Sequence, residues 1–423
     1  MKRYERYKPS AIEWIGKIPE HWDITKLKFM TDNLDKNRIP LSSSERSVKR
    51  GEYPYYGATG IIDYIDGYIF DGEYVLIGED GAPFFQKNRD VAFVASGKFW
   101  VNNHAHILRT REGYLPKVIA HQLNCVDYRE YITGSTRDKL TQDELNEIRL
   151  INIPKEEQAT IVDFLGHKTA QIDDLIARKQ KLIDLLNEEK TAIINQAVTK
   201  GLDPNTPMKD SGIPWIGKIP AHWKIKKIKY IANLTLGKML TGEDKGGNFL
   251  KPYLRAQNIS WFKCDTSDVK EMWFSKSELI KYRVNLNDLL VSEGGDVGRT
   301  CIWMNELDEC YIQNSVHKIT FKKYFNPKYF LYLFYCFGRK GYFLSIVNQI
   351  SIGHLTGEKL KEVFTIFPGF DEQTAIVDYL DRKTDQMDDV ISKTHHEIEL
   401  LQEYRTALIS EAVTGKIDVR GVN

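Results

Sequence analysis

The stretch Gly16-Lys17-Ile18-Pro19-Glu20-His21-Trp22 decides the fold, because it returns almost unchanged as Gly217-Lys218-Ile219-Pro220-Ala221-His222-Trp223. A second segment, Glu157-Gln158-Ala159-Thr160-Ile161-Val162-Asp163, returns as Glu372-Gln373-Thr374-Ala375-Ile376-Val377-Asp378. Solenoid repeats have periods of about 20–50 residues, and these copies lie much further apart. The sequence therefore predicts two duplicated domains in one chain. A partner with two related halves would suit such a protein, and duplex DNA is the commonest one.

Two segments, residues 156–203 and 371–415, are predicted to form long helices. Within residues 156–200 there is no proline, and apolar residues alternate at spacings of three and four in both copies, which is typical of a coiled coil. We favour an antiparallel pair that acts as a rigid spacer over two ordinary core-facing helices. The predicted seam of this pair consists of Ile161, Leu165, Ile172, Leu175, Leu182, Leu186 and Ile193 in the first helix and Ile376, Leu380, Met387, Val390, Leu401, Tyr404 and Leu408 in the second.

The rest of the chain is predicted to form two related domains, residues 1–155 and 204–370, followed by a tail at 416–423. Many short strands indicate a mixed α/β (α+β) fold. Asn103-His104-Ala105-His106 corresponds to Asn314-Ser315-Val316-His317, and Leu140-Thr141 corresponds to Leu355-Thr356. The predicted architecture is two globular domains related by a pseudo-twofold axis and separated by two long antiparallel helices. Four tryptophans recur between the copies and are interpreted as packing residues: Trp14, Trp22, Trp215 and Trp223.

The bulk composition is that of an ordinary globular protein, with 423 residues and five cysteines. Because the cysteines are odd in number and lack CxxC spacing, neither a disulfide framework nor a zinc knuckle is expected, and a reducing cytoplasm fits. The first residues lead into no apolar stretch typical of a secretory signal, and no apolar run is long enough to span a membrane. We therefore expect no membrane association.

The net charge of +1 is unevenly distributed along the chain. The helical segments 156–200 and 371–415 carry −2 and −7, whereas residues 201–370 carry +8 and residues 1–155 carry +1. An acidic scaffold repels phosphate, which leaves the two domains to contact nucleic acid. Ordinary drift of surface charge is the alternative explanation.

Catalytic signatures are missing from the sequence. It contains no GxxxxGK[ST] phosphate loop, no Asn-Pro-Pro-aromatic or Asp-Pro-Pro-aromatic tetrapeptide, and no His-Glu-x-x-His motif. Two acidic pairs, Glu79-Asp80 and Glu293/Asp296, lie in glycine-rich turns and are interpreted as structural rather than as nuclease carboxylates. His104 and His106 could share one face of a strand, but no third ligand is evident, so we interpret them as packed, hydrogen-bonded histidines rather than metal ligands.

Candidate DNA-binding residues are loop residues of the types that contact phosphates and base edges. We expect that only some of them touch DNA, since each alone fits a solvated loop. In the first domain they are Tyr55, Tyr56, Lys87, Asn88, Arg89, Asn102, Asn103, Ser135, Thr136, Arg137 and Lys139. In the second they are Lys238, Arg255, Gln257, Asn258, Arg299, Gln313, Asn314, Gln349, Ser351 and His354.

These landmarks together resemble the DNA-specificity subunit of type I restriction–modification systems. The resemblance covers essentially the whole chain and depends on the order recognition domain, long helix, recognition domain, long helix. It rests on the following stretches: residues 16–22 with their copy, Pro54-Tyr55-Tyr56-Gly57-Ala58-Thr59-Gly60-Ile61-Ile62, Leu76-Ile77-Gly78-Glu79-Asp80-Gly81, Pro252-Tyr253-Leu254-Arg255-Ala256-Gln257-Asn258-Ile259, and Ile153-Pro154-Lys155-Glu156-Glu157-Gln158 with Phe367-Pro368-Gly369-Phe370-Asp371-Glu372-Gln373.

The resemblance implies that each domain recognises one half of a split target in double-stranded DNA and that the helices fix the gap. It further implies two methyltransferase subunits that bind S-adenosylmethionine and methylate adenine, and restriction subunits that use ATP and Mg. This chain itself would hold no cofactor or metal, catalyse nothing, and work in the prokaryotic cytosol. Two alternatives remain: a stand-alone nuclease or methyltransferase with a duplicated recognition module, and a coiled-coil adaptor without DNA binding.

Overall fold

The computed structural model describes residues 2–86, 89–132, 138–244, 246, 248–347 and 354–421. The chain divides into two compact units, Met1–Lys181 with Thr394–Asn423, and Leu182–Lys393. Each unit contains a mixed α/β domain and parts of two long helices, which agrees with the predicted fold class. No helix in the described ranges is long and apolar enough to cross a membrane.

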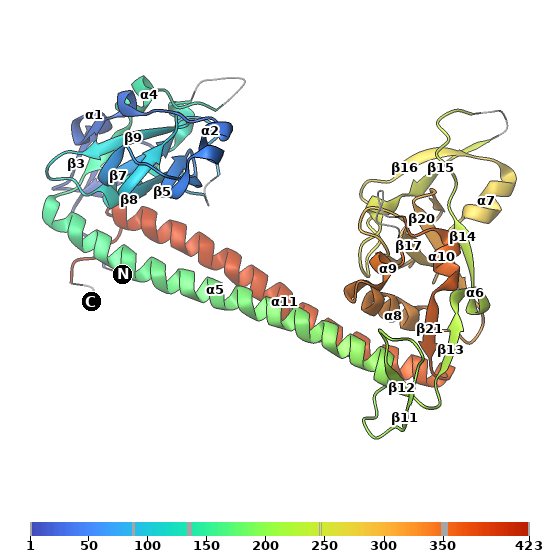
Figure 1. Ribbon diagram of the computed structural model, residues 1–423. Helices are drawn as coiled ribbons and strands as arrows, with labels where there is room; N and C mark the ends of the chain where they lie inside the picture. Colours follow the sequence, from blue (N-terminus) through green and yellow to red (C-terminus); the bar gives the residue numbers. More distant parts are fainter. Residues whose placement is uncertain are drawn as a thin grey trace. The chain divides into compact units, whose positions relative to one another are not determined.

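The domain of the first unit is built on a six-stranded sheet with the order β4-β9-β7-β8-β5-β6. Neighbouring strands are antiparallel except β5 and β8, which are parallel. One face of the sheet, whose strands β5, β7, β8 and β9 are labelled in Figure 1, contributes Val75, Ile77 and Leu108 to a core completed by Ile119 and Leu123 of the helix α3. The strands are β4 (Thr31–Asn33), β5 (Arg50–Gly57), β6 (Gly60–Ile65), β7 (Phe70–Gly78), β8 (Ala92–Val101) and β9 (Ala105–Thr110), and α3 is Pro116–Leu123.

Shorter elements complete this domain. Two strand pairs, β1 with β2 and β3 with β10, are antiparallel. The helices α2 and α4 each begin with a capping box, from Ser42 and Thr141 respectively. The bounds are β1 (Tyr7–Pro9), β2 (Lys17–Pro19), β3 (Asp23–Lys26), β10 (Arg149–Asn152), α1 (Leu27–Met30), α2 (Ser43–Val48), α4 (Gln142–Glu147), and the 3-10 helices η1 (Asp35–Asn37) and η2 (Tyr128–Glu130).

The domain of the second unit has two central sheets, β14-β20-β17-β18 and β16-β15-β19. The apolar helix α8 buries nine consecutive residues, Tyr329 to Phe337, at the centre of the core. The bounds are β14 (Ala232–Leu236), β15 (Phe249–Leu254), β16 (Lys270–Phe274), β17 (Leu289–Ser292), β18 (Thr300–Ile302), β19 (Tyr311–Ile312), β20 (Val316–Phe321), α6 (Ile228–Ile231), η3 (Ala256–Asn258), α7 (Lys276–Tyr282), α8 (Pro327–Arg339), α9 (Tyr342–Ser345) and α10 (Gly357–Glu362).

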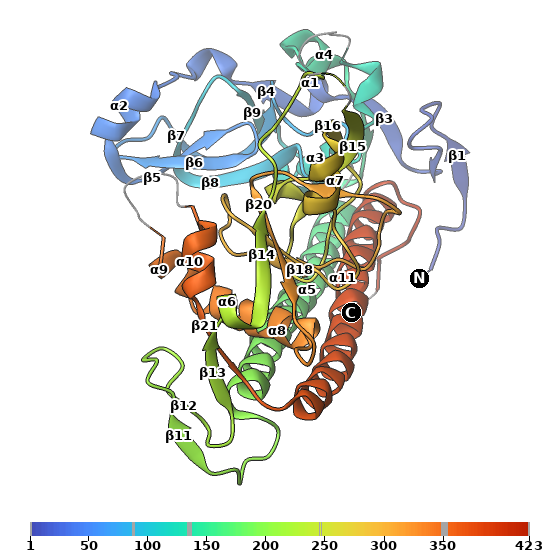
Figure 2. The same cartoon turned by 90° about the vertical axis from the view of Figure 1, so that its right-hand side faces the viewer.

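Two further strand pairs repeat those of the first unit. The strands β11 (Met208–Asp210) and β12 (Lys218–Pro220) pair antiparallel, and β13 (Lys224–Lys227) lies beside β21 (Phe364–Phe367), as Figure 2 shows. In the first unit Glu147 is ion-paired with Lys26 and Lys28, and in the second Glu362 is ion-paired with Lys227 and Lys229. The duplication therefore extends to individual side-chain contacts.

The two long helices are α5 (Lys155–Lys200) and α11 (Phe370–Val413). In the first unit Asp173 is paired with Arg405 at 2.9 Å and Lys179 with Glu397 at 2.6 Å, so the helices run antiparallel there. In the second unit Lys190 is paired with Asp388 at 2.6 Å. Near the ends of the pair, the helices share apolar cores with their domains.

The seam register predicted from the sequence is partly wrong. Leu175 and Leu182 are 41% and 43% exposed, while the next residues, Ile176 and Ile183, are half-buried and buried. In α11, Val390 and Tyr404 are likewise exposed. Six seam predictions are buried as expected, namely Ile161, Leu165, Ile172, Ile376, Leu380 and Leu408. Four more are half-buried, namely Leu186, Ile193, Met387 and Leu401.

The sequence misplaced part of the register because some positions between the two helices are occupied by polar residues. Thr384 and Thr394 of α11 are buried, and Lys190 lies half-buried against its ion-pair partner Asp388. A helix turns 100° per residue, so where two apolar residues are adjacent, only the whole face determines which one points inward. The buried face of α5 passes through Ile176 and Ile183, one residue beyond the predicted positions.

Each domain is attached to the start of a long helix through an equivalent set of contacts. Trp22 is fully buried, and its indole Nε1 donates to Glu157 of α5 at 3.3 Å, while Nε2 of His21 lies 2.6 Å from the same carboxylate. In the second unit Trp223 and His222 make the same contacts with Glu372. The recurring tryptophans Trp22 and Trp223 are therefore packing residues, as the sequence predicts.

Candidate nucleic-acid interface

The predicted residues of the second domain come together on a few neighbouring loops. The backbone N–H of Asn314 donates to the carbonyl of Lys238 at 2.8 Å, and that of Gln313 donates to Leu254 at 3.0 Å, next to Arg255. The hydroxyl of Ser315 accepts from the N–H of Ala256 at 2.9 Å. Arg299 reaches the same place, because its Nη2 donates to the carbonyl of Ala256 at 3.4 Å. Sequence reasoning thus identified a real cluster.

Two members of this cluster have internal roles. The side chain of Asn258 is 2% exposed and donates to the carbonyls of Asp265 and Asp268 at 2.9 and 3.1 Å. The ammonium of Lys238 donates to Trp273 and pairs with Glu278 at 2.6 Å. These side chains are occupied within the domain, which corrects the prediction that they are available to DNA.

Other members lie nearer the surface. Gln257 is exposed, and Arg255, Arg299, Gln313 and Asn314 are half-buried. The side chains of Arg255 and Arg299 are 19% and 24% exposed. Five donors per guanidinium in a fixed fork make arginine suited to phosphate and guanine, so these two are the strongest DNA-binding candidates of the second domain.

In the first domain the structure corrects several predictions. Tyr55 is fully buried, and its hydroxyl accepts from the N–H of Leu41 at 2.9 Å. Asn102 is buried and accepts from the N–H of His104 at 2.8 Å. Tyr56 packs half-buried against Phe93 and Phe99, and burial raises the pKa of its phenol. Tyr55 and Asn102 thus bond to backbone groups of their own domain, and Tyr56 packs within it.

The remaining predicted residues of the first domain lie at the surface or outside the described residues. Arg89 and Asn103 are exposed, and the ammonium of Lys139 lies 3.1 Å from Glu79. His354 of the second domain is exposed. The predictions at Lys87, Asn88, Ser135, Thr136, Arg137, Gln349 and Ser351 fall outside the described residues.

The loops of both domains are held by the same backbone framework. In the first domain, Glu79 donates its N–H to His104 and accepts from the N–H of Leu140, both at 2.8 Å. In the second, Glu293 donates to Ser315 at 2.9 Å and accepts from Leu355 at 2.8 Å.

A buried histidine completes each framework. His106 Nε2 lies 2.8 Å from the carbonyl of Leu140, and His317 Nε2 lies 2.7 Å from that of Leu355. The two domains therefore present different side chains on equivalent backbone frameworks.

A trio of potential metal ligands in the first domain is better explained as a hydrogen-bond network. Asp35, Glu79 and His106 offer atoms within 4.8 Å of one another. Arg38 donates to Glu79 at 2.8 Å and lies 3.4 Å from Asp35, so one guanidinium already pairs with both carboxylates. His106 Nδ1 lies 2.5 Å from Asp35, which helps to hold the pKa of that carboxyl below its ordinary value against the effect of burial. This agrees with the interpretation of His106 as a packed histidine and of Glu79 as a structural acid.

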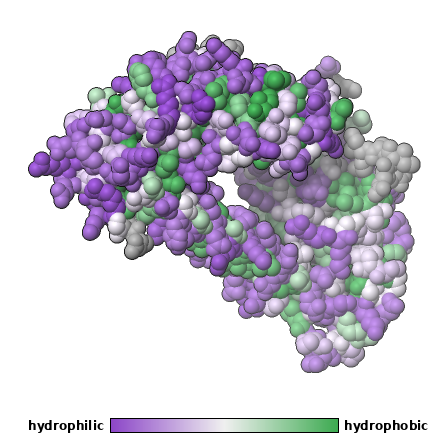
Figure 3. All heavy atoms as spheres, turned by 60° about the vertical axis from the view of Figure 1, so that its left-hand side comes forward, coloured by the Kyte–Doolittle hydropathy of each residue, from purple (hydrophilic) through white to green (hydrophobic). Residues whose placement is uncertain are grey.

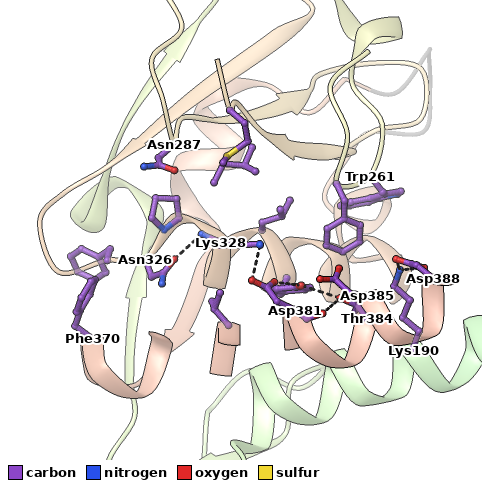
Figure 4. A pocket seen from close by; sticks show the side chains of 18 residues that line it. Lys190, Trp261, Asn287, Asn326, Lys328, Phe370, Asp381, Thr384, Asp385 and Asp388 are labelled. Carbon is purple, nitrogen blue, oxygen red and sulfur yellow. Dashed lines mark hydrogen bonds and ion pairs between the residues drawn. The ribbon is translucent and has the colours of Figure 1, made fainter. Parts of the chain in front are cut away.

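A pocket of about 760 Å³ lies in the second unit between α8 and α11 (Figure 4). Its walls include Trp261 and Phe262, and α11 lines it with Asp381, Asp385 and Asp388. Lys328 pairs with Asp381, and Lys190 with Asp388. Three carboxylates against two ammonium groups disfavour a phosphate, so this pocket is a poor place for DNA.

Sequence reasoning missed two groups of residues. Asp268, the carboxylate bound by Arg255, went unnoticed because an aspartate in a loop is ordinarily a solvated turn residue. Glu157 and Glu372 were used as repeat markers, although their role as acceptors for His21, Trp22, His222 and Trp223 followed from the same repeats. The recurrence of His-Trp and Glu-Gln together was the signal that could have revealed it.

Comparison with known proteins identifies relatives of the whole chain. The family model described as the type I restriction modification DNA specificity domain matches residues 19–185 and again residues 220–400. A putative type I restriction enzyme specificity subunit of Haemophilus influenzae is 28% identical over 358 residues, which span 82% of this chain and 84% of that protein. The putative MjaX specificity subunit of Methanocaldococcus jannaschii is 23% identical over 96% of both chains.

A solved structure has the same fold. It comes from a study of complex assembly and conformational transition of the type I R-M system, and it matches with a TM-score of 0.68 and 13% identity over 95% of this chain and 99% of that one. Both family matches lie on the parts of the sequence that the internal repeats relate to one another. The chain therefore belongs to the type I restriction–modification DNA specificity family, as a target-recognition subunit that carries two copies of the family domain.

Proposed function

We propose that each domain of this specificity subunit recognises one half of a bipartite target in double-stranded DNA. The observation that carries the proposal is the shared loop framework, in which Glu79 and Glu293 make equivalent backbone bonds. The side chains on that framework differ, as in His104 against Ser315. Two related supports with different surface residues suit two different half-sites, because base edges are recognised by side chains on loops or helices.

Modification and cleavage would belong to partner subunits. We infer that two methyltransferase subunits supply S-adenosylmethionine chemistry at adenine, and that restriction subunits supply ATP- and Mg-dependent cleavage, in the prokaryotic cytosol. The chain itself would be non-catalytic and hold no cofactor. The pairing of Glu79 with Arg38 and Lys139 fits a structural acid.

The long helices are the proposed docking sites for the partners. Exposed apolar side chains interrupt their otherwise charged surface, and Figure 3 shows the visible face of the molecule as mainly hydrophilic with small apolar patches. Partner subunits would bury such residues, because apolar area removed from water stabilises an interface. The exposed large apolar residues of the helices are Leu175, Leu182, Leu185, Phe370, Val390, Leu400 and Tyr404.

The long helices are also proposed to set the length of the gap between the two half-sites. Both continue without interruption past the positions at which the chain divides into its two units. At 1.5 Å per residue α5 is about 69 Å long. Two recognition domains on one polypeptide make the second binding event intramolecular, so affinity rises without new contacts.

The test is single-molecule sequencing of methylated adenines in DNA from cells that express the complete complex. We expect one bipartite motif with a fixed gap. Replacing residues 208–370 with the matching domain of a relative should change one half of that motif and leave the other half intact. A change in both halves would contradict independent recognition.

A mobility shift on mixed-sequence DNA, with and without partner subunits, tests DNA binding itself. Binding should weaken with salt, because phosphate contacts release counterions. Absence of any shift with the partners present would favour the adaptor alternative. Metal-dependent nicking by the purified chain alone would favour the stand-alone nuclease.

A further inference from the structure

The loop that carries Asp268 is fixed by buried contacts. It follows η3 and leads into β16, and the amide of Asn258 holds it from inside by donating to the carbonyls of Asp265 and Asp268. The N–H of Asp265 donates back to the carbonyl of Asn258 at 2.8 Å. Because the supporting amide is buried, the loop and its aspartate are held in one position.

Two side chains of the candidate interface converge on one oxygen of Asp268. Nη2 of Arg255 donates to Oδ2 at 2.5 Å, and Nε2 of Gln257 donates to the same atom at 3.1 Å. Among the described residues, no hydrogen bond reaches the other oxygen, Oδ1. The side chain of Asp268 is 64% exposed. An acceptor with unused lone pairs is therefore presented to solvent beside an arginine.

The arginines around this carboxylate have unused donors. Arg255 donates to Asp268 through Nη2, and Arg299 donates through its own Nη2 to the carbonyl of Ala256, the residue that follows Arg255. The side chains of Arg255 and Arg299 are 19% and 24% exposed, so part of each guanidinium is open to solvent. Donors and a fixed acceptor are thus available side by side.

This combination matches base edges better than it matches phosphates. In the major groove guanine offers the acceptors O6 and N7, which arginine can bind bidentately, whereas cytosine N4 and adenine N6 carry amino donors that a carboxylate can accept. A carboxylate repels phosphate, so it would weaken a surface that contacts the DNA backbone alone. Beyond its ion pair with Arg255, the carboxylate would gain from contact with DNA only where an amino group comes close to Oδ1.

We propose that Asp268 is a specificity-determining residue of the second domain, whose Oδ1 accepts a hydrogen bond from the exocyclic amino group of a cytosine or adenine. Its Oδ2 at the same time fixes the guanidinium of Arg255 for the neighbouring base. This inference rests on the proposed function, because it requires that the second domain reads a half-site.

The experiment compares the intact complex containing wild-type chain, Asp268→Asn or Asp268→Glu, by sequencing of methylated adenines and by competition binding to single-base variants of the target. Asp268→Asn converts part of the acceptor into a donor. Asp268→Glu keeps the charge and shifts the oxygens, so it retains charge neutralisation of Arg255 but not the geometry. Asp203→Asn removes an equal charge from the exposed turn after α5 and serves as the control.

Both Asp268 variants should lower discrimination at one base pair of the second half-site by roughly 5-fold to 150-fold. The first half-site and the Asp203→Asn complex should show unchanged preferences. Unchanged preferences in both Asp268 variants, or an equal loss of affinity for all sequences, would overturn the proposal. If the wild-type complex itself produced no bipartite motif, the proposed function would fail instead.

Discussion

Trp22 donates its indole N–H to the carboxylate of Glu157, and this bond joins the first domain to the first turn of α5. The same carboxylate is contacted by His21 at 2.6 Å and accepts from the hydroxyl of Tyr4 at 2.8 Å. Burial and this acidic neighbour raise the pKa of the Tyr4 phenol, so the hydroxyl stays protonated as a donor. Glu157 is therefore the acceptor around which the N-terminal segment is arranged.

Glu157→Gln should destabilise the protein by about 2 kcal/mol, because a buried group loses charge-assisted bonds and gains a donor facing other donors. The matched variant Glu372→Gln should cost less, since Glu372 is more exposed and accepts from fewer partners. Urea-induced unfolding of both variants measures the difference. Equal costs would show that the extra bonds of Glu157 contribute nothing.

The corrected seam can be tested with adjacent residues. Ile183 is 3% exposed and Leu182 is 43% exposed, although the sequence favoured Leu182. Ile183→Ala should cost about 2–4 kcal/mol through lost burial and a cavity, whereas Leu182→Ala should cost below about 0.5 kcal/mol. Thermal or urea unfolding of the two variants provides the measurement. A larger cost for Leu182→Ala than for Ile183→Ala would support the register predicted from the sequence.

Asn258 and Gln257 are adjacent in the sequence, but alanine substitutions at the two positions should have different effects. Asn258→Ala should lower stability by about 1–3 kcal/mol, because the carbonyls of Asp265 and Asp268 lose the donor that the buried amide supplies. Gln257→Ala should leave stability nearly unchanged, since its side chain is exposed, and alter DNA binding if it reaches the target. Melting curves combined with mobility shifts separate the effects. A stable Asn258→Ala variant with altered base choice would contradict the structural role.

Stability should depend on pH through His121. Burial, with Arg405 and Lys117 nearby, lowers its pKa to about 4, whereas an unfolded histidine has a pKa near 6.5. Between these values the unfolded chain binds the additional proton, so stability falls as the pH drops from about 6.5 to 4. His121→Gln should flatten the unfolding free energy across that window. Measurement at pH 7.5 gives the packing cost separately, and an unchanged slope would exclude His121 as the cause.

The spacer role predicts a change in target gap. Deleting four residues from each helix would shorten the pair by about 6 Å at 1.5 Å per residue. A spacing of about 3.4 Å per base pair makes this roughly two base pairs. Sequencing of methylated adenines should then show the same half-sites at a shorter gap. An unchanged gap in an active complex would rule out the helices as the ruler.

Sequence patterns predicted the large features because those features repeat. The helices expected at 156–203 and 371–415 are Lys155–Lys200 and Phe370–Val413, and the matching His106 and His317 occupy equivalent places. Repetition, however, does not show which way a side chain points. Leu175 and Ile176 are both apolar, and the choice between them depends on how the whole helix packs.

The candidate interface was predictable as a set of loops but not residue by residue. The loops at Arg255–Asn258 and at Gln313–Asn314 do meet, as backbone hydrogen bonds between their neighbours show. Asn258 and Tyr55 nevertheless satisfy backbone groups of their own domains. Such internal bonds depend on loop conformation, which residue type alone does not encode. Asp268 was missed for the same reason, since its significance comes from Arg255 and Gln257.

The contact between Trp223 and Glu372 has a consequence for inheritance. The two residues lie on opposite sides of the second domain in the sequence, with Trp223 before the loops of the candidate interface and Glu372 after them. A recombination event that imports a new domain between these positions keeps the attachment intact, provided both flanking segments are retained. If the second domain recognises a half-site as proposed, exchange of the interior of the gene would change the target preference while the attachment to α11 is kept.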